Sequence, residues 1–378
     1  MNNYLSQDQI DRLLAIEDLT KNPTHAIGIA RNLLISALEL KFGLKADVIT
    51  GSPIVEKENN FKKLGYEDTE VTTGTRYCKY LSEDRLFRTQ MTSSVPPTLE
   101  SLAQDKDSWN EKLMVFPGMV YRRDVVDKTH VGQPHQMDVW YLQKERPMTR
   151  EDLLGLVQVI VDQISNLVGQ KIIFRCNETE HNYTDAGIEV EILYKGKWLE
   201  ILECGLAGRK LLTQSGFGEE YSGLALGMGL DRFVMLVKNI EDIRSLRDTN
   251  PRVQAQMENL KKYTVVSKQP PIRRDMSIVV WKDTLLEELT EKVMENIGEK
   301  ASWVEEITIT TSTDHDMIPE AIRPRIGIKP GQENWLIKVI LRDVGRSLTA
   351  EEANAFYTEM YPLIHQGTVG YSLSSKAA

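Results

Sequence analysis

Two arginines, each set beside acids or glycines, are the residues of this sequence best suited to chemistry at a phosphate. Arg122 lies in VYRRDVV, two positions before Asp124, and Arg232 lies in GMGLDR, close after Gly227 and Gly229. A guanidinium binds a phosphate or a carboxylate through two parallel hydrogen bonds, and such fixed cations stabilise charge that develops on phosphate oxygens. The residues alone leave a structural alternative open for each segment: a surface hairpin with cross-strand charge pairs, and glycines that allow close packing.

The segments around these arginines are expected to be strands of a sheet flanked by helices. The strand-like runs EKLMVFPGMVYRRDVV and HQMDVWYLQKE flank a polar loop at 127–134, and period-two spacing places Arg122 and Asp124 on one face of the first. Residues 70–98 are expected to be loop-rich and to stop at Pro96-Pro97. Further strands are expected at KIIFRCN, GIEVEILY and KWLEILECG, a strand leading into a helix at GLALGMGLDRFVMLV, and amphipathic helices at HAIGIARNLLISALELKFGL and EDLLGLVQVIVDQISNLVG.

A domain boundary is expected near residues 261–271, where a polar stretch ends in two prolines. Beyond it the sequence predicts a strand, a helix, two strands and a second helix, with a final short strand near Gly370. A long irregular insertion separates the two middle strands. This order is typical of a ferredoxin-like α+β module, in which helices cover one face of a sheet.

The bulk properties narrow the class of protein. A chain of 378 residues is long enough for two domains, and its net charge of −9 argues against indiscriminate binding to nucleic acid. No apolar run approaches the roughly 20 residues that span a bilayer, and the N-terminus lacks the features of a signal or transit peptide, so a cytoplasmic protein is expected. The three cysteines form no CxxC pair, which disfavours a zinc site or a disulfide framework.

Taken together, YRRD and GMGLDR resemble motifs 2 and 3 of the class II aminoacyl-tRNA synthetases. The nearest resemblance is to phenylalanyl-tRNA synthetase, and it covers about residues 20–370. DVVDKTH followed by HQ is similar to the motif 2 loop of that family. The segments THAIGIARNLL, NNFKKLGY, LFRTQMTSS, WLEILECG and, towards the C-terminus, PPIRRDMSIVV and RDVGRSLTAEEAN are also similar.

This resemblance implies an α+β fold with an antiparallel sheet of six or seven strands, flanked by helices, as the catalytic domain. We expect that domain over residues 1–262, a linker over 263–270, and a ferredoxin-fold domain similar to the family's anticodon-binding domain over 271–378. The order of domains resembles the single-chain organellar enzyme. Motif 1, the helix at 25–42 with the strand that ends at Pro53, is the dimer element of class II enzymes, so the resemblance implies a homodimer.

The resemblance also implies that ATP and an amino acid react to form an aminoacyl-adenylate, with Mg²⁺ as the cofactor. Arg122 would hold the α-phosphate and the amino-acid carboxylate, and Arg232 the γ-phosphate and the adenine. Asp124 would accept from the adenine amino group, and His130 would help with the phosphates. Glu200 is the best match to the metal-binding acid before motif 3, and Glu189 is second. The alternative for Glu200, and more so for Glu191, is an exposed strand carboxylate.

The amino-acid site departs from the family pattern. Asp138 stands where the family has Glu and Thr92 where it has Ser, while His181 and Tyr183 replace two phenylalanines that wall the phenylalanine pocket. Glu203 adds a carboxylate where the family has Gly. We therefore expect a substrate that is more polar than phenylalanine or differently shaped; a misalignment by two residues is the alternative. The resemblance places these residues at the amino acid: Thr92, Gln136, Asp138, His181, Tyr183, Gly205 and Gly227.

The acceptor of the activated amino acid stays open at this point. The C-terminal module favours tRNA by resemblance, but residues 268–378 hold 13 Lys and Arg against 17 Asp and Glu. Three hypotheses follow: a synthetase that charges tRNA, a paralogue that serves a carrier protein or small molecule, and a non-catalytic regulatory relative. An RNA-binding face would need local basic groups, namely Arg273, Arg274, Arg323, Arg325, Lys329, Arg342 and Arg346.

Overall fold

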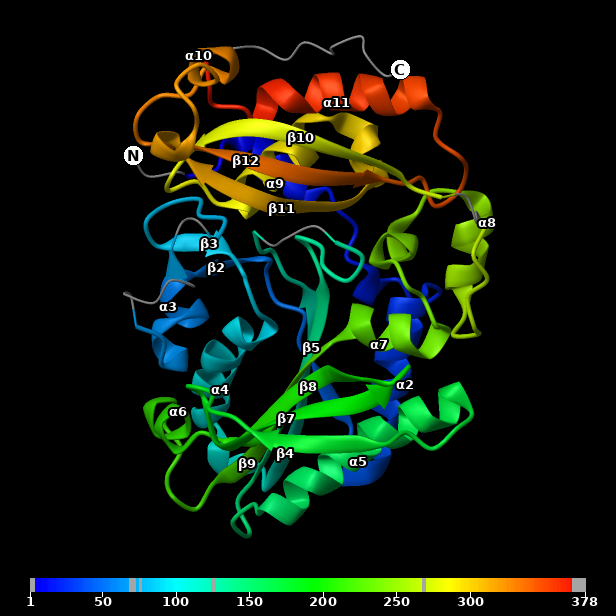
Figure 1. The fold of residues 1–378 in the computed structure, drawn as a ribbon. Helices are drawn as coiled ribbons and strands as arrows, with labels where there is room; N and C mark the ends of the chain where they lie inside the picture. The colour runs from blue at the N-terminus through cyan, green and yellow to red at the C-terminus, as the bar shows by residue number, and fades with distance from the viewer. Residues whose placement is uncertain (1–3, 68–72, 75–76, 124–126, 267–269, 369–378) are drawn as a thin grey trace. The chain divides into compact units, whose positions relative to one another are not determined.

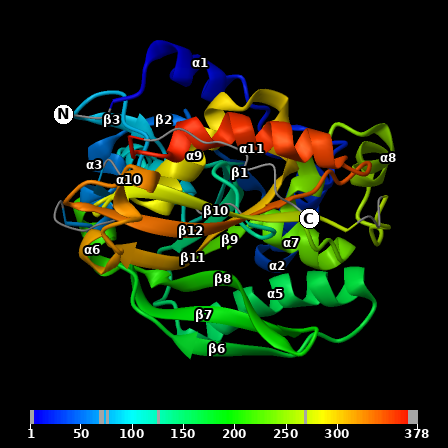
Figure 2. The ribbon, with the colours of Figure 1, turned by 45° about the horizontal axis from the view of Figure 1, so that its top comes forward.

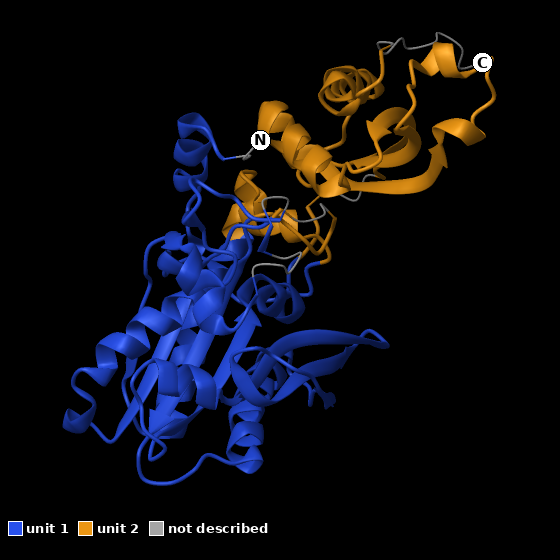
Figure 3. Cartoon of the chain, turned by 90° about the vertical axis from the view of Figure 1, so that its left-hand side faces the viewer, with its two compact units in different colours: residues 1–122, 133–240, 256–263 blue, residues 123–132, 241–255, 264–378 orange. Residues whose placement is uncertain are grey.

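A computed structural model describes residues 4–67, 73–74, 77–123, 127–266 and 270–368. They belong to two compact units (Figure 3): unit 1 comprises residues 1–122, 133–240 and 256–263, and unit 2 comprises 123–132, 241–255 and 264–378. The sequence-based domain boundaries remain a prediction, because unit 2 also includes two segments that precede residue 263. No helix among the described residues has both the length and the apolar character needed to cross a membrane.

A seven-stranded sheet forms the centre of unit 1 (Figure 1). Its order is β1-β4-β5-β9-β8-β7-β6; β1 pairs with β4 in parallel and all other neighbours pair in antiparallel fashion. The expected α+β fold with a largely antiparallel sheet is therefore confirmed. The strands are β1 (Ala46–Val48), β4 (Glu111–Met119), β5 (His135–Gln143), β6 (Phe174–Glu178), β7 (Thr184–Tyr194), β8 (Lys197–Ala207) and β9 (Ser222–Gly229).

Three helices that pack on one another cover one face of this sheet: α2 (Ala26–Phe42), α5 (Arg150–Val168) and α7 (Leu230–Lys238). Local sequence defines their ends. Thr149 and Asp152 form a capping box at the start of α5, and Gly43 and Gly169 end α2 and α5 in the left-handed conformation that glycine adopts without strain. Phe42 of α2 stacks on Tyr141 of β5 with ring centroids 4.2 Å apart, which fixes the helix layer against the sheet.

Shorter elements cover part of the opposite face: η4 (Met91–Ser94), α4 (Val95–Ala103) and α6 (Arg209–Gln214). The stop expected at Pro96-Pro97 is wrong, because both prolines lie in the first turn of α4. There the missing N–H groups cost nothing and the fixed φ suits a helix. The remaining named elements of the N-terminal part are α1 (Gln7–Leu14), η1 (Leu19–Lys21), β2 (Ile54–Glu56), α3 (Lys57–Asn60), η2 (Lys62–Leu64), β3 (Arg85–Phe87) and η5 (Lys106–Ser108).

Strand β4 ends before the arginine that it was expected to carry. It stops at Met119, and the amide of Tyr121 donates to the carbonyl of Arg88 instead of continuing the ladder with β5. Arg122 therefore follows the strand, so the expectation that the strand includes it is wrong, while its alignment with Asp124 stays a prediction. Asp124 itself lies outside the described residues.

Unit 2 contains a three-stranded sheet, ordered β10-β12-β11 and antiparallel throughout. Its elements follow the expected order: β10 (Ile272–Trp281), α9 (Leu286–Asn296), β11 (Val304–Asp314), β12 (Gln332–Leu341) and α11 (Ala350–Ile364). After α11 the amide of Gln366 donates to the carbonyl of Val279, so the chain returns alongside β10. The final strand expected near Gly370 lies outside the described residues, and the ferredoxin-like assignment remains a prediction.

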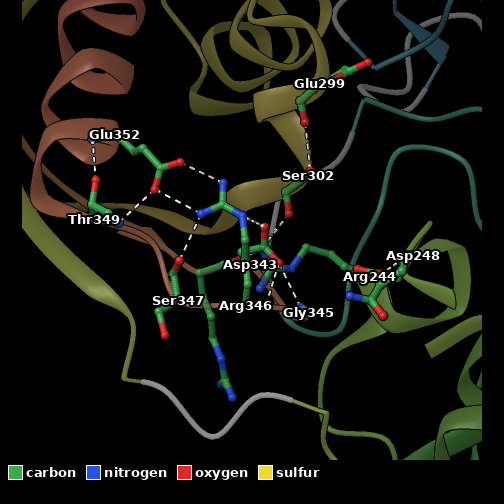
Figure 4. A network of polar contacts seen from close by, with 12 residues as sticks. Arg244, Asp248, Glu299, Ser302, Asp343, Gly345, Arg346, Ser347, Thr349 and Glu352 are labelled. Atoms are coloured by element: carbon green, nitrogen blue, oxygen red, sulfur yellow. Dashed lines mark hydrogen bonds and ion pairs between the residues drawn. The ribbon is translucent and has the colours of Figure 1, made fainter. Parts of the chain in front are cut away.

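Paired charges hold the C-terminal part of unit 2 together (Figure 4). Arg346 makes two hydrogen bonds to the carboxylate of Glu352, and Glu352 also completes a capping box with Thr349 at the start of α11. Arg244 donates to the carbonyls of Ser302 and Arg342. The remaining short elements of the chain after α7 are η6 (Ile243–Arg247), α8 (Pro251–Gln254), η7 (Ala255–Glu258), η8 (Gly298–Trp303), η9 (His315–Met317) and α10 (Arg323–Ile326).

A buried lysine at the end of α7 binds the last segment of unit 1 to this helix. Lys238 is 0% exposed, and its ammonium group donates to the carbonyls of Gln256, Asn259 and Lys261. The amide of Tyr263 donates back to the carbonyl of Lys238. Three acceptors around one buried cation satisfy all its N–H groups, so this lysine fixes the segment 256–263 on the helix that carries Arg232.

We expect Lys238→Met to lower the free energy of unfolding by about 2–4 kcal/mol, because three buried carbonyls lose a charged donor. Urea unfolding followed by tryptophan fluorescence measures this change. Lys171→Met, at an exposed position, is the matched control and should unfold within about 0.5 kcal/mol of the wild type. Equal midpoints for the Lys238 variant and the wild type would contradict the assigned role.

Candidate active site

A row of polar side chains crosses the sheet of unit 1 on the face opposite α2, α5 and α7. The strand register pairs Asp138 of β5 with Gly227 of β9, Gly227 with Glu203 of β8, and Glu203 with Glu189 of β7. Residues paired across neighbouring strands point to the same face. Figure 2 shows β9, β8 and β7 lying side by side. Three acids and one glycine, widely separated in sequence, therefore share one surface.

A β-bulge adds a fourth acid to this surface. Glu189 pairs with Glu203, but Glu191 pairs with Glu200, so three steps along β8 oppose two along β7. Without the extra residue, side chains three apart on a strand would point to opposite faces. The bulge therefore brings Glu200 to the face that Glu203 and Glu189 occupy. The spacing in WLEILECG gave no sign of this, because strict alternation predicts the reverse.

Arg232 and Glu200 contact each other at this surface. Arg232 Nη1 donates to the carbonyl oxygen of Glu200 at 3.0 Å and lies 3.6 Å from its carboxylate oxygen Oε2. Burial raises the pKa of Glu200, Arg232 opposes that rise, and the charges of Glu203 and Glu189 add to it. Both side chains keep substantial exposure, 34% for Arg232 and 43% for Glu200, so a ligand can reach them.

His135 and Asp231 position two of the expected site residues, and the sequence reasoning missed this pair. Asp231 accepts from the backbone amide of His135, and its other oxygen lies 2.9 Å from His135 Nδ1. His135 Nε2 accepts from the amide of Leu19, so the proton of the neutral ring is on Nδ1. These contacts join the start of β5 to the start of α7, directly beside Gln136 and Arg232. His135 lies in the HQ pattern and Asp231 in the LDR pattern, so both residues could have been found from the sequence motifs.

Arg122 is held by the carbonyl of Thr89, which accepts from its Nε at 2.7 Å. Thr89 in turn exchanges two hydrogen bonds with the side chain of buried Asn60. Arg88, also buried, donates to the carbonyls of Thr50, Ser52 and Met119. A Cβ at Gly118 would come within 2.3 Å of Arg88 Nη2. Asn60, Arg88 and Gly118 thus support the segment that carries Arg122. The similarity of NNFKKLGY and LFRTQMTSS to the family pointed to the segments that contain Asn60 and Arg88.

Asp138 is almost completely buried beneath the row. Its Oδ2 accepts from Thr92 Oγ1 at 2.6 Å, and only 4% of the residue is exposed. Burial raises the pKa of Asp138 to about 7; the Thr92 hydrogen bond and the charge of Arg122 lower it, while Glu203 raises it. Burial also raises the pKa of Tyr183, with Asp138 as the next cause. Asp138 and Tyr183 together therefore carry at most one negative charge near pH 7.

His181 and Tyr183, expected as pocket walls, lie together beside Glu203. Their rings are 6.1 Å apart and nearly parallel, and Tyr183 also lies 6.5 Å from the ring of buried Trp140. His181 Nε2 is 3.3 Å from Glu203 Oε2, an ion-pair distance without the geometry of a good hydrogen bond. The contact with His181 lowers the pKa of Glu203 against the effect of burial, and Arg122 lowers it further. Glu203 is therefore ionised at neutral pH.

Gln136, Gly205 and His130, the other expected site residues, have different surroundings. Gln136 accepts from the amide of Met91 through Oε1 at 3.3 Å, on the same face as Asp138. A Cβ at Gly205 would lie 2.6 Å from the Thr184 side chain, so packing alone requires glycine there, and its contact with a substrate remains a prediction. His130 belongs to unit 2, where its Nδ1 contacts the carboxylate of Asp127.

The two arginines act electrostatically on the same row of acids. Arg122 lowers the pKa of Asp138 and Glu203, and Arg232 acts against the raised pKa of Glu200. Glu203 in turn contributes to the shift of Glu200. Arg122 donates to Thr89, two residues before Met91, whose amide donates to Gln136 on the face of the row, and Arg232 contacts Glu200. Both arginines therefore lie near one surface that carries cations and carboxylates. Such a surface suits a zwitterion beside a polyphosphate.

The acids of this row fit Mg²⁺ only together with a substrate. Mg²⁺ is usually bound in proteins through one or two carboxylates plus phosphate oxygens and water. Glu189 and Glu200 meet that description, since they share a face; burial is the main cause of the raised pKa of Glu200, and the charge of Glu189 adds to it. No group of three or more metal-binding side chains occurs among the residues that the structure describes.

The pKa of Asp138 generates a test of stability against pH. An ordinary aspartate has a pKa of about 3.9, so between pH 4 and 7 folded Asp138 keeps a proton that the unfolded chain loses. Stability therefore falls as pH rises through this window and levels off above it. Asp138→Asn removes this loss, so its stability relative to the wild type should increase by up to about 4 kcal/mol between pH 4 and 8. Urea unfolding at both pH values measures the difference, and a constant difference would contradict the buried, proton-holding state.

Comparison with known proteins gives relatives that include phenylalanine–tRNA ligase alpha subunits. The phenylalanine–tRNA ligase alpha subunit of Synechocystis sp. is 29% identical over 216 residues, which are 57% of this chain and 62% of that protein. The corresponding subunit of Acaryochloris marina is 29% identical over 255 residues, 66% of this chain and 74% of that protein. The match thus spans less than two thirds of the Synechocystis protein. Relatives named as alpha subunits give no support to the expected homodimer.

Among solved structures, pyrrolysyl-tRNA synthetase from Desulfitobacterium hafniense is 13% identical, with a TM-score of 0.47 over 65% of this chain and 79% of that chain. A score of this size carries no argument about the site. The family description tRNA synthetases class II core domain (F) matches residues 16–257, which include both arginines and the whole acid row. The resemblance is thereby confirmed at the level of the family: this chain belongs to the class II core domain (F) family of tRNA synthetases.

Proposed function

We propose that this chain activates an amino acid with ATP to form an aminoacyl-adenylate and transfers the aminoacyl group to tRNA. The observation that carries the proposal is the pair Arg122 and Arg232, which are held near one row of carboxylates on the sheet by contacts with Thr89 and Glu200. Family membership and the names of the relatives support the reaction class. The acceptor rests on those names and on the expected C-terminal module.

The first task of such a site is to bring two anions together. The carboxylate of the amino acid must approach the α-phosphate of ATP, and negative charge then builds up on the phosphorus oxygens and the leaving pyrophosphate. Arg122, held at its Nε by Thr89, presents the rest of its guanidinium to these groups. Arg232 lies at the other border of the row, where it meets the phosphates farther from the reacting centre. Both cations are positioned before the substrates bind, so little reorganisation accompanies the reaction.

Glu200 and Glu189 would hold Mg²⁺ when ATP is bound. The ion would supply charge that neutralises the phosphate oxygens. Arg232 contacts Glu200 in this structure, so the carboxylate is already oriented towards the polyphosphate side of the row. His130 and Asp124 remain proposed ATP contacts on the strength of the family resemblance alone.

We also propose that unit 2 binds tRNA. Fewer basic residues are candidates for this role than the sequence analysis named, because several of them have partners in the structure. Arg346 is paired with Glu352, Arg342 lies 3.7 Å from Glu305, and Arg323 donates to the carbonyls of Ile318 and Asp316. An RNA phosphate would have to compete with these contacts. Arg274 likewise donates to the carbonyl of Arg273. Arg273 on β10, Arg325 and Lys329 are therefore the better candidates for phosphate contacts.

The amino acid activated is proposed to be more polar than phenylalanine. His181 and Tyr183 form the wall where the family has two phenylalanine rings, and both bring hydrogen-bonding groups beside the carboxylate of Glu203. A buried polar group that its ligand does not satisfy costs about 1–3 kcal/mol. Phenylalanine would leave such groups unsatisfied, whereas a side chain with its own donor or acceptor would pair with them.

Arg122→Lys and Arg232→Lys should each reduce ATP–pyrophosphate exchange at least tenfold to a hundredfold. Lysine keeps the charge but lacks the planar fork that binds two oxygens, and each charge-assisted hydrogen bond is worth about 1.5–3 kcal/mol. Exchange kinetics at saturating ATP measure the loss. Arg85→Lys, an exposed arginine 3.6 Å from Glu56, is the control and should stay within about twofold of the wild type. Wild-type rates in both site variants would refute the role of the pair.

A panel of the twenty amino acids in the exchange assay tests the substrate, followed by charging of total tRNA with the best of them. We expect an amino acid with a polar side chain to give a kcat/KM at least tenfold above that of phenylalanine, corresponding to about 1.4 kcal/mol of discrimination. Phenylalanine as the clear best substrate would disprove the polar pocket. Exchange without any charging of tRNA would instead favour the carrier-protein or small-molecule acceptor.

A further inference from the structure

We infer that Glu203, rather than Asp138, supplies the carboxylate that binds the α-ammonium group of the amino-acid substrate. This inference rests on the proposed function, since it names a contact in the same site. The family pattern assigns the ammonium to Gln136 and to an acid at position 138. In this chain the side chains around position 138 prevent that acid from serving as the charged partner, and a second acid is available across the sheet.

Asp138 is poorly available to a ligand. Only 4% of the residue is exposed, and Oδ2 is occupied by the hydroxyl of Thr92 at 2.6 Å. Its other oxygen leans towards Gly227, where an added Cβ would lie 3.4 Å from Oδ1. Burial among Thr92, Tyr183 and Trp140 makes ionisation costly, in agreement with its raised pKa of about 7. An ammonium group pairs weakly with a carboxyl group that keeps its proton.

Glu203 has the opposite properties. Its side chain is 44% exposed, and its Oε2 lies 3.3 Å from His181 Nε2. It points to the same face as Asp138, because both are in register with Gly227 of the strand between them. Glu203 is therefore the accessible carboxylate at this part of the row.

The glycine between the two acids provides the space for a small cation. Neighbouring strands lie about 4.8 Å apart, so the backbones at Asp138 and Glu203 are about 10 Å apart with Gly227 midway. Because Gly227 has no side chain, the floor between them is backbone alone. An ammonium group over this floor meets Glu203 on one side and the inner oxygen of Asp138 on the other. Arg122, which acts on both acids, is then available for the carboxylate of the same substrate.

His181 acts as a positioning residue in this arrangement. Its Nε2 lies 3.3 Å from Glu203, its Nδ1 is 3.2 Å from Thr184 Oγ1, and its ring lies parallel to that of Tyr183. A Cβ at Gly187 would come within 2.8 Å of His181 Nδ1, so the glycine is needed for the imidazole to lie there. Glu203 stands where the family has Gly, and His181 stands where it has Phe. These two departures from the family pattern contact each other.

The test compares each substrate with its analogue that lacks the amino group. Calorimetry without ATP measures binding of the amino acids of the panel and of the des-amino acid that matches the tightest one. Wild-type protein should prefer the amino acid by about tenfold to a hundredfold, the value of one charge-assisted hydrogen bond. Glu203→Gln should lose this preference while it binds the des-amino acid as the wild type does. Asp138→Asn should keep most of the preference.

Two further variants separate the ammonium contact from general effects. Glu180→Gln removes an exposed carboxylate next to His181 and should bind like the wild type. Glu203→Asp keeps the charge and should restore part of the preference. Loss of the preference in Asp138→Asn but not in Glu203→Gln would overturn the inference. Binding with the stated preference but without pyrophosphate exchange would refute the proposed function alone, and absence of binding by any amino acid would overturn both.

Discussion

The register between β5, β9, β8 and β7 is the constraint on which the site depends. It places Asp138, Gly227, Glu203 and Glu189 in one line on one face, although they come from three distant parts of the chain. A slip by one residue in any of these strands would turn its acid towards the helix layer of α2, α5 and α7, where no water could solvate the charge. The apolar side chains on the helix side therefore fix the position of the acids on the other side.

Buried polar contacts then fix the two arginines relative to this row. His135 and Asp231 join β5 to α7 beside Arg232, and Asn60 with Thr89 holds the backbone that anchors Arg122. The contact between His135 and Asp231 is buried and the other two are partly buried, so breaking one would cost up to about 1–3 kcal/mol. The guanidinium groups can consequently face a substrate in one geometry. Under the proposed function, these supporting side chains would supply much of the pre-organisation that electrostatic catalysis requires.

The amino-acid end of the row combines rigidity with unusual polarity. Asp138 is enclosed by Thr92 and aromatic rings, while Glu203 with His181 presents charge to the open side. The two acids are coupled through space, because ionised Glu203 makes ionisation of Asp138 harder. Burial therefore assigns different states to two carboxyl groups on the same face, and the ammonium group of a substrate would meet the ionised one.

The sequence by itself determined the family and the order of the elements, because short-range patterns carry that information: hydrophobic period, caps and the YRRD and GMGLDR motifs. The roles of the site residues stay a prediction. It was wrong where local pattern competes with tertiary contacts. Pro96 and Pro97 open α4 instead of stopping the chain, and β4 ends before Arg122 because Tyr121 bonds to Arg88. Only the tertiary structure decided that a bulge brings Glu200 beside Glu203 and that Asp138 is enclosed. Strand register, burial and the ionisation of acids depend on residues far apart in sequence, so no local pattern reports them.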